Sequence, residues 1–251
     1  MKKWSWLLLS LLAGWYFFQT PTSERLQLPS LHHFMGTDFL GRDLLGRTMQ
    51  AMTFSLALGI LSALAAFSLG GFLGFWAGYL GGSIETLFSL VLDFFTLFPT
   101  ILLALTCTLI LGKNIAALFI TLTLSSWITS AKRTRDLVLP FRELPYVTAS
   151  EALGANPWHI LRVHAISTLK KPLWICFTAQ IATNTMTESL LSFLGLGIQP
   201  PYASLGTLIQ EGFRALRAYP HLLFFPGTIL VITLLLLTQW EPQKLTETSL
   251  R

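Results

Sequence analysis

The chain carries few side chains that could do chemistry inside a long apolar segment. Asn184 and Glu188 lie one helical turn apart in such a segment, so both project from the same helix face. Polar side chains at that depth face a cavity or a neighbouring helix rather than lipid. We therefore expect Asn184 and Glu188 to line a polar path, with contacts in a helix core as the alternative.

Asp93 is a carboxylate within a second long apolar segment. A charge in lipid is costly, so this side chain should face protein, water or the membrane interface. A relay for protons or ions is one interpretation, and a carboxylate that holds helices together near the interface is the other. We favour the second interpretation because no other carboxylate lies in register nearby.

The motifs of metal sites and hydrolytic enzymes are missing from the sequence. His32 and His33 precede Asp38, but adjacent histidines do not share a helix face and no third ligand follows at a suitable spacing, so no metal site is predicted. Gly112-Lys113 lacks the glycine and the hydroxyl residue of a phosphate-binding loop. No HExxH or GxSxG pattern occurs. The chain is therefore predicted not to be an enzyme, and a membrane-embedded enzyme using Asp93, Glu188 or histidine finds no motif to support it.

The composition indicates an integral membrane protein. Of the 251 residues, 53% are hydrophobic and only 12% are charged, with a mean hydropathy of +0.61. A soluble domain typically has about 25% charged residues. The net charge of +5 comes from basic side chains in loops beside apolar segments, as expected for cytoplasmic loops. Nucleic acid is not predicted as a partner, because no basic run is interleaved with aromatic residues.

The apolar segments predict an all-α fold, a polytopic membrane bundle of about six helices with both chain termini in the cytoplasm. The segments are residues 4–18, 52–79, 84–111, 115–130, 172–196 and 221–240. A kink is expected near Leu97 to Pro99, because proline removes a helical hydrogen bond. Residues 208–217 predict a short amphipathic helix at the membrane interface.

The predicted segments divide the chain into four parts. Residues 1–20 form a first transmembrane helix, and a signal peptide is the alternative. We favour the helix because an Ala-x-Ala cleavage site is missing. Residues 21–51 are predicted to form an external loop, residues 52–240 the transmembrane domain and residues 241–251 a cytoplasmic tail.

Two glycine patterns bear on packing. Gly70, Gly74 and Gly78 fall four residues apart on one helix face, and small residues at this spacing let another membrane helix approach closely. Gly36, Gly41 and Gly46 instead recur every five residues in the external loop, among two arginines and two aspartates. We expect this loop to be solvated, with turns held by local ion pairs.

Residues 131–171 form a polar, positively charged region between two apolar segments, and this charge predicts a cytoplasmic location. The sequence from Tyr146 to Leu153 predicts a short helix that Gly154 ends, because glycine is the usual residue beyond a helix C-terminus. Asn156-Pro157 then begins a second helix, with asparagine as the cap and proline in the first turn. The sequence therefore predicts a compact cytoplasmic protrusion of two short helices.

Three stretches together resemble the permease subunits of bacterial dipeptide and oligopeptide ABC importers, of the DppC and OppC type. The first is Gly36-Thr-Asp-x-x-Gly-Arg-Asp-x-x-x-Arg47, which is similar to the signature after the first span of these subunits. The second is residues 131–171, which resembles their cytoplasmic coupling loop. The third is Ser189-Leu-Leu-Ser-Phe-Leu-Gly-Leu-Gly-Ile-Gln-Pro-Pro201, followed by Glu211-Gly212. The resemblance covers residues 36–240.

The resemblance implies the type I ABC importer permease fold, which is MetI-like, and a place in the bacterial inner membrane. It implies a second permease subunit, two cytoplasmic ATPase subunits that bind ATP and Mg²⁺, and an external solute-binding protein as partners, with no cofactor in this chain. Peptides are the implied substrates, and the alternatives are nickel or another small solute, or a channel or structural subunit. The implied ATPase-coupling residues are Tyr146, Thr148, Ala149, Ser150, Glu151, Ala152, Leu153 and Gly154.

The chain departs from the family pattern at two places in the coupling loop. Thr148-Ala149-Ser150 stands where the family usually has Glu-Ala-Ala, and Ser167 stands near the position of a family proline. Gly154 matches the family glycine. Because the order of helix, glycine and helix is kept, we expect coupling to survive these changes.

Overall fold

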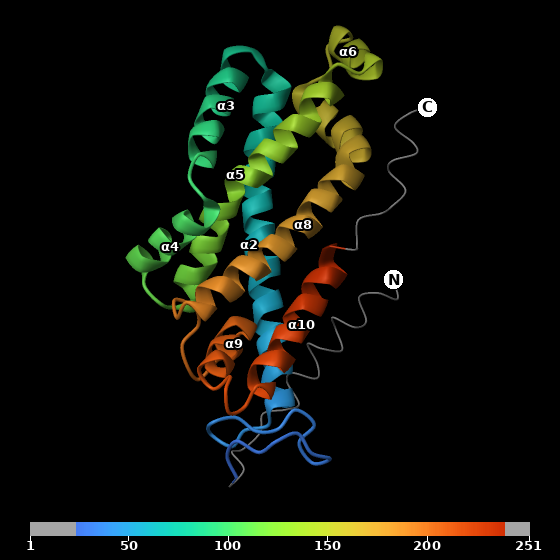
Figure 1. The fold of residues 1–251 in the computed structure, drawn as a ribbon. Helices are drawn as coiled ribbons and strands as arrows, with labels where there is room; N and C mark the ends of the chain where they lie inside the picture. The colour runs from blue at the N-terminus through green and yellow to red at the C-terminus, as the bar shows by residue number, and fades with distance from the viewer. Residues whose placement is uncertain (1–23, 239–251) are drawn as a thin grey trace.

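The computed structural model describes residues 24–238, and these fold into helices joined by short connections (Figure 1). The predicted first helix and the C-terminal tail lie outside the described residues. Within residues 24–238, extended pairing is limited to one bridge between Thr37 and Asp43. The helices are α2 (Leu44–Leu80), α3 (Gly82–Thr96), α4 (Thr100–Leu111), α5 (Ile115–Arg142), α6 (Pro145–Ala152), α7 (Pro157–His159), a π-helical turn (Ile160–Ala165), α8 (Ile166–Phe193), α9 (Leu205–Arg214) and α10 (His221–Thr238).

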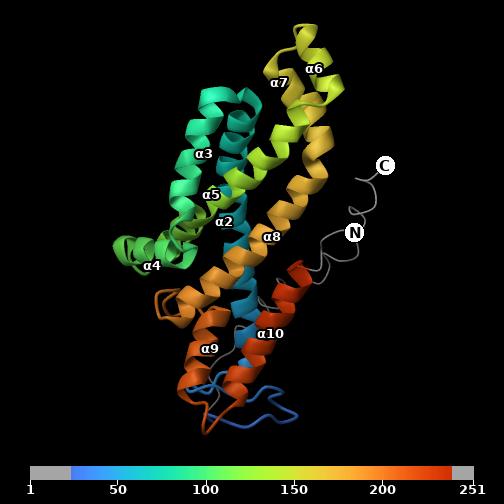
Figure 2. The same ribbon diagram turned by 45° about the horizontal axis from the view of Figure 1, so that its top comes forward.

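Helix α2 runs the length of the molecule and packs most extensively against α5 and α8 (Figure 1). The side chain of Asp43 caps its N-terminus by accepting a hydrogen bond from the Gly46 N–H at 3.0 Å. Gly81, with a φ of 65°, ends it. The α6 end of the molecule carries α6 and α7, and the opposite α9 end carries α9 and residues 24–43 (Figures 1 and 2).

The predicted third span is broken rather than kinked. Helices α3 and α4 meet at an angle of 80°, and α4 runs sideways from the end of α3 (Figures 1 and 2), packed against α5. The break lies where Pro99 was expected to disturb the helix. Proline lacks the N–H that would continue α3, and it restricts Phe98 before it to non-helical conformations, so the chain stops one helix and starts another.

The helices that contain the fourth and fifth predicted spans extend beyond the apolar residues. Helix α5 continues to Arg142 rather than ending at residue 130, and α8 begins at Ile166 rather than at residue 172. Only residues 143–165, which we name the α5–α8 loop, lie between them. The drop in hydropathy marks where a helix leaves the lipid, whereas charged side chains remain compatible with helix beyond that point.

The described part of the chain has three helices that are long and apolar enough to span a membrane, which are α2, α5 and α10. The bent pair of α3 and α4 makes a fourth if it counts as one span. Helix α8, the predicted fifth span, is 28 residues long but polar in its middle. Polar residues there face other helices of the bundle, which is why apolarity alone does not identify α8.

Helix α9 covers most of the segment predicted to be an amphipathic helix, and other helices bury its apolar face. It packs against α8 and α10, and Leu205 and Leu208 are buried. Two glycines allow this approach: a Cβ atom at Gly206 would lie 2.0 Å from the backbone oxygen of Ser189, and one at Gly212 would lie 2.5 Å from the backbone of Leu222. The helix is therefore part of the bundle.

Candidate coupling loop and buried polar contacts

The α5–α8 loop folds through the local signals that its sequence contains. Helix α6 begins with Pro145 in its first turn, and Gly154 follows it with a φ of 83°. The Gly154 and Ala155 N–H groups donate to carbonyls of α6 at 2.9 and 3.0 Å and close its C-terminus. Asn156 then caps α7 by accepting from the Trp158 N–H at 2.9 Å. The predicted order of helix, glycine and helix is therefore observed.

The loop is supported by a hydrophobic cluster of its own. Val147 and Ile160 are 0% exposed, and Ala165 at the end of the loop is 2% exposed. They contact side chains from three of the long helices: Phe75 of α2, Val138 and Phe141 of α5, and Leu169 of α8. Because the loop shares this cluster with those helices, side-chain packing holds it against the bundle in addition to its covalent connections to α5 and α8.

Besides this packing, a hydrogen bond and ring contacts connect the loop directly to the end of α2. The Tyr79 hydroxyl donates to Oε1 of Glu151 at 2.6 Å. The indole rings of Trp76 and Trp158 meet edge to face with centroids 5.0 Å apart. In addition, the Arg142 guanidinium donates to the Gly78 carbonyl at 3.1 Å and joins α5 to the same turn of α2.

The tip of the loop exposes apolar side chains. Leu153 is 89% exposed and Trp158 is 47% exposed. Most of the residues that the resemblance assigns to coupling are also exposed, whereas Ser150 is half-buried and accepts or donates a hydrogen bond with His164 at 3.3 Å. The tip thus offers a surface to a partner while its base is fixed by the bundle. The exposed set is Tyr146, Thr148, Ala149, Glu151, Ala152, Leu153 and Gly154.

Ser167, which stands near the position of the family proline, lies in the first turn of α8. Its hydroxyl donates to the carbonyls of Val163 and His164 at 2.7 and 2.8 Å. The π-helical turn and α8 therefore continue into one another at this point, and the serine follows the helical path without a break.

Asn184 and Glu188 are buried inside this chain. Asn184 donates to the Ser62 hydroxyl of α2 at 2.9 Å and accepts from Gln180 at 2.9 Å. The Ser192 hydroxyl donates to Glu188 at 2.7 Å, and Glu188 is 0% exposed. Both side chains therefore lie in contacts of the helix core, which is the alternative to lining a path.

Asp93 holds two helices together, as the second interpretation of this residue predicts. Its carboxylate lies 2.7 Å from Nζ of Lys132, so it joins α3 to α5. Arg135, one turn further along α5, contacts Glu85 of α3 with Nε 2.7 Å from Oε1. Lys132 and Arg135 both lie in the half of α5 that leads to α6.

The α9 end carries an ion-pair network that the sequence did not predict in full. Asp38 is 2% exposed, and its Oδ2 atom lies 2.8 Å from Nε of Arg42 and 2.6 Å from Nη1 of Arg47. Nη1 of Arg47 also contacts Glu211 of α9 at 2.9 Å. Burial raises the pKa of Asp38, but the Arg42 N–H and the Arg47 charge outweigh burial and hold this pKa below its usual value.

The network departs from the expected solvated loop with local ion pairs. Glu211 lies 164 residues beyond Arg47 in the sequence. A pattern of neighbouring residues cannot predict an ion pair between residues so far apart in the chain. The only sequence signal was that both residues belong to stretches that carry the family resemblance. The structure brings these two stretches together.

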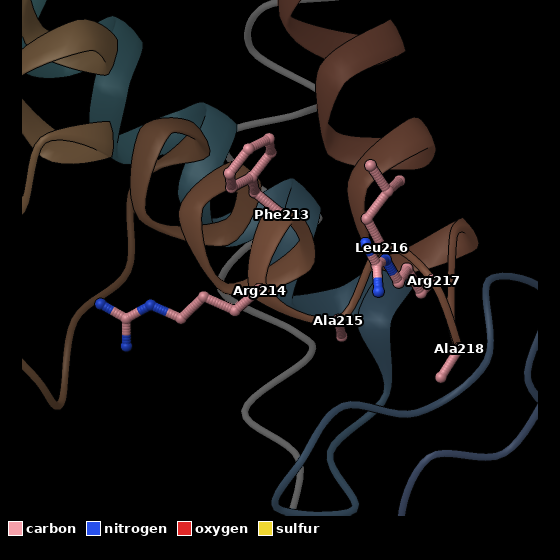
Figure 3. Close-up of a pocket in the computed structure, with 6 residues that line it drawn as sticks. All are labelled: Phe213, Arg214, Ala215, Leu216, Arg217 and Ala218. Carbon is pink, nitrogen blue, oxygen red and sulfur yellow. The ribbon is translucent and has the colours of Figure 1, made fainter.

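A shallow hollow of about 340 Å³ lies beyond α9 and is lined by residues 213–218. Two arginines border it, but Figure 3 shows the Arg214 side chain extending away from Arg217. The two guanidinium groups do not converge on one point, so they do not form a shared anion site. Among residues 24–238, no three His, Cys, Asp or Glu side chains gather as metal ligands.

Comparisons with known proteins identify the family. Residues 70–240 match the family model described as "Binding-protein-dependent transport system inner membrane component". The chain is 33% identical to the oligopeptide transport system permease protein OppC of Bacillus subtilis, over 82% of this chain and 68% of the relative. It is 32% identical to the glutathione transport system permease protein GsiD of Pectobacterium atrosepticum, over 82% of this chain and 69% of the relative.

A solved structure agrees with this assignment at the level of the fold. The matching chain belongs to an inward-facing structure of the MetNI methionine ABC transporter, with a TM-score of 0.61 over 78% of this chain and 93% of the matched chain. At 19% identity the likeness concerns the fold alone, and it confirms the predicted all-α, MetI-like architecture. The chain therefore belongs to the family of inner-membrane components of binding-protein-dependent transport systems, the non-catalytic multi-pass permease subunits of ABC transporters, whose ATP is bound by partner subunits.

Proposed function

We propose that this chain is the permease subunit of an ATP-driven importer of peptides. It forms the translocation path with a second permease, two ATPase subunits bind below it, and an external solute-binding protein delivers the substrate. The names of the relatives support the substrate class, because they include an oligopeptide, a dipeptide and a glutathione permease at 32–33% identity.

The α6 end is the cytoplasmic end in this proposal, and both chain termini lie on that side. The support is the distribution of charge. Residues 131–171 carry seven basic and three acidic side chains, and an excess of Lys and Arg favours the cytoplasmic side of a membrane. Residues 24–43 and α9 then face outward, where a binding protein arrives.

The α5–α8 loop is the docking site for an ATPase subunit. The observation that carries this proposal is the combination of a fixed base and an apolar, exposed tip: Val147 is 0% exposed, whereas Leu153 is 89% exposed. A side chain as apolar and exposed as Leu153, beyond the membrane-spanning part of the helices, fits a protein partner better than water. Thr148, Ser150 and Ser167 leave this shape intact.

The test is a co-purification from detergent-solubilised membranes with Gly154→Trp. Gly154 has a φ of 83° and no atoms near an added Cβ, so a side chain there strains the turn and enlarges the tip without clashing with the bundle. We expect wild type to retain both ATPase subunits and the second permease. The amount of ATPase that co-purifies with the variant should fall at least about tenfold, because the change disturbs the centre of a small interface. Cells that carry the variant should lose peptide uptake.

Gly82→Trp is the matched control. Gly82 has a φ of 60° and open space around it, but it lies in the turn between α2 and α3 rather than in the loop. This variant should keep its ATPase subunits. Wild type that purifies without any ATPase would overturn the proposal, and so would equal retention in the two variants.

A further inference from the structure

Helix α2 connects the two ends of the molecule without interruption. Its 37 residues correspond to about 55 Å at 1.5 Å per residue. Of the four longest helices in the described part, α2 alone contains no proline: the others contain Pro140, Pro172 and Pro226. Proline is a common cause of helix bending, and α2 lacks this cause.

At the α6 end, two of the α2 side chains that contact the loop lie three residues apart. Trp76 meets the ring of Trp158 at 5.0 Å, and Tyr79 donates a 2.6 Å hydrogen bond to Glu151. Residues at this spacing share one helix face. These two contacts connect both helices of the loop, α6 and α7, to the same face of α2.

At the α9 end, the first turns of α2 are tied to the outward-facing segments. Arg47 contacts Asp38 of the preceding loop and Glu211 of α9 at 2.6 and 2.9 Å. A displacement of α2 along its axis would therefore act on both of these segments. The same helix carries the loop contacts at one end and this ion-pair network at the other.

We propose that Tyr79 and Trp76 are positioning residues, which couple movement of the α5–α8 loop to α2 and through α2 to the Arg47–Glu211 contact. This inference rests on the proposed function of the loop. It adds a route that does not pass through the covalent connections of the loop to α5 and α8.

The covalent connections are suited to bend rather than to transmit. Pro140 lies near the end of α5, and the π-helical turn Ile160–Ala165 precedes α8. Both features interrupt the regular hydrogen bonds of a helix and are common at hinges. Direct contacts from the loop to α2 bypass these hinges, because Glu151 and Trp158 lie between them in the chain.

The test uses the complete importer in proteoliposomes and measures ATP hydrolysed per peptide imported. Tyr79→Phe and Glu151→Ala each remove the hydrogen bond, and we expect each to raise this ratio about three- to tenfold. The double variant should be no worse than either single variant, because the two changes break one contact. Glu151→Gln keeps an acceptor for the tyrosine hydroxyl and should raise the ratio less than Glu151→Ala does.

Thr168→Val is the control, in α8 beside the same loop. The Thr168 hydroxyl bonds the Tyr146 hydroxyl at 2.9 Å, and this contact does not reach α2, so its loss should leave the ratio unchanged. Additive effects of Tyr79→Phe and Glu151→Ala, or an unchanged ratio in both, would overturn the inference. Co-purified ATPase subunits distinguish the two proposals: their presence in all variants with an unchanged ratio removes only the role of α2, whereas their absence from wild type removes the proposed function itself.

Discussion

Arg47 binds two carboxylates from segments far apart in the chain. The Arg47 side chain is 11% exposed, and its guanidinium contacts both Asp38 and Glu211. A planar guanidinium with several donors suits such a bridge better than an ammonium group. Because Asp38 is almost fully buried, removing Arg47 would leave a buried negative charge with fewer partners. That charge determines how much the free energy of unfolding falls.

Arg47→Gln should therefore destabilise the chain by about 1–3 kcal/mol, measured as thermal unfolding in detergent, because it leaves a buried carboxylate with fewer charged donors. Arg42→Gln is the matched control: the Arg42 side chain is 27% exposed, and within residues 24–238 its ion pair is with Asp38. Its loss should cost less than about 1 kcal/mol. Equal losses in the two variants would show that the bridge to Glu211 contributes nothing.

Helices α2 and α5 approach closely because glycines of α2 face the backbone of α5. A Cβ atom at Gly70 would lie 2.3 Å from the Trp127 carbonyl oxygen, and one at Gly74 would lie 2.2 Å from that of Ala131. Gly78 is less restricted, at 3.1 Å from the Arg135 carbonyl oxygen. Close backbone approach of this kind is a main source of packing energy between helices in a membrane, where hydrophobicity favours no helix over lipid.

Gly74→Ala should push α2 and α5 apart and lower the stability of the detergent-solubilised chain by about 1–3 kcal/mol. Gly71→Ala is the matched control three residues earlier, where the new Cβ would meet Thr134 at an ordinary 3.7 Å. That variant should be neutral or more stable by up to about 1 kcal/mol, because alanine is the better helix former. A loss of stability at Gly71 as large as that at Gly74 would contradict the assignment of the interface.

Across the whole molecule, the sequence predicted the features that depend on local chemistry. Apolar runs located the long helices of the described residues, Pro99 located the break, and Gly154 with Asn156 located the turn in the loop. The sequence did not give the helix ends near residues 130 and 172, because hydropathy reports the surroundings of a helix rather than its hydrogen bonds.

Contacts between distant segments were equally hidden from the sequence. Tyr79 lies 72 residues before Glu151, and Arg47 lies 164 residues before Glu211. Neither pair has a periodicity or motif that marks it. The packing of α9 was missed for a related reason: its polar face resembles that of an interfacial helix, and only the contacts of Gly206 and Gly212 show that the other face is buried.

The exposed side chains of the whole molecule separate into two kinds of surface. Val231 is 56% exposed in the middle of α10, and Leu31 is 88% exposed in the loop before α2. A membrane protein covers the first kind with lipid or another subunit and leaves the second kind in water. The exposed fraction of a side chain in the isolated chain does not distinguish these two kinds of surface. A lysine introduced at each position can distinguish them.

Val231→Lys should reduce the amount of folded, membrane-inserted chain, because a lysine at the centre of a spanning helix costs about 2.5–3.5 kcal/mol on insertion scales. Leu31→Lys should leave that amount unchanged, because its side chain reaches water. The measurement is the monodisperse fraction of fluorescently tagged chain extracted from membranes. Equal yields of the two variants would mean that α10 presents Val231 to a water-filled space, and the membrane boundary of the bundle would then have to be drawn elsewhere.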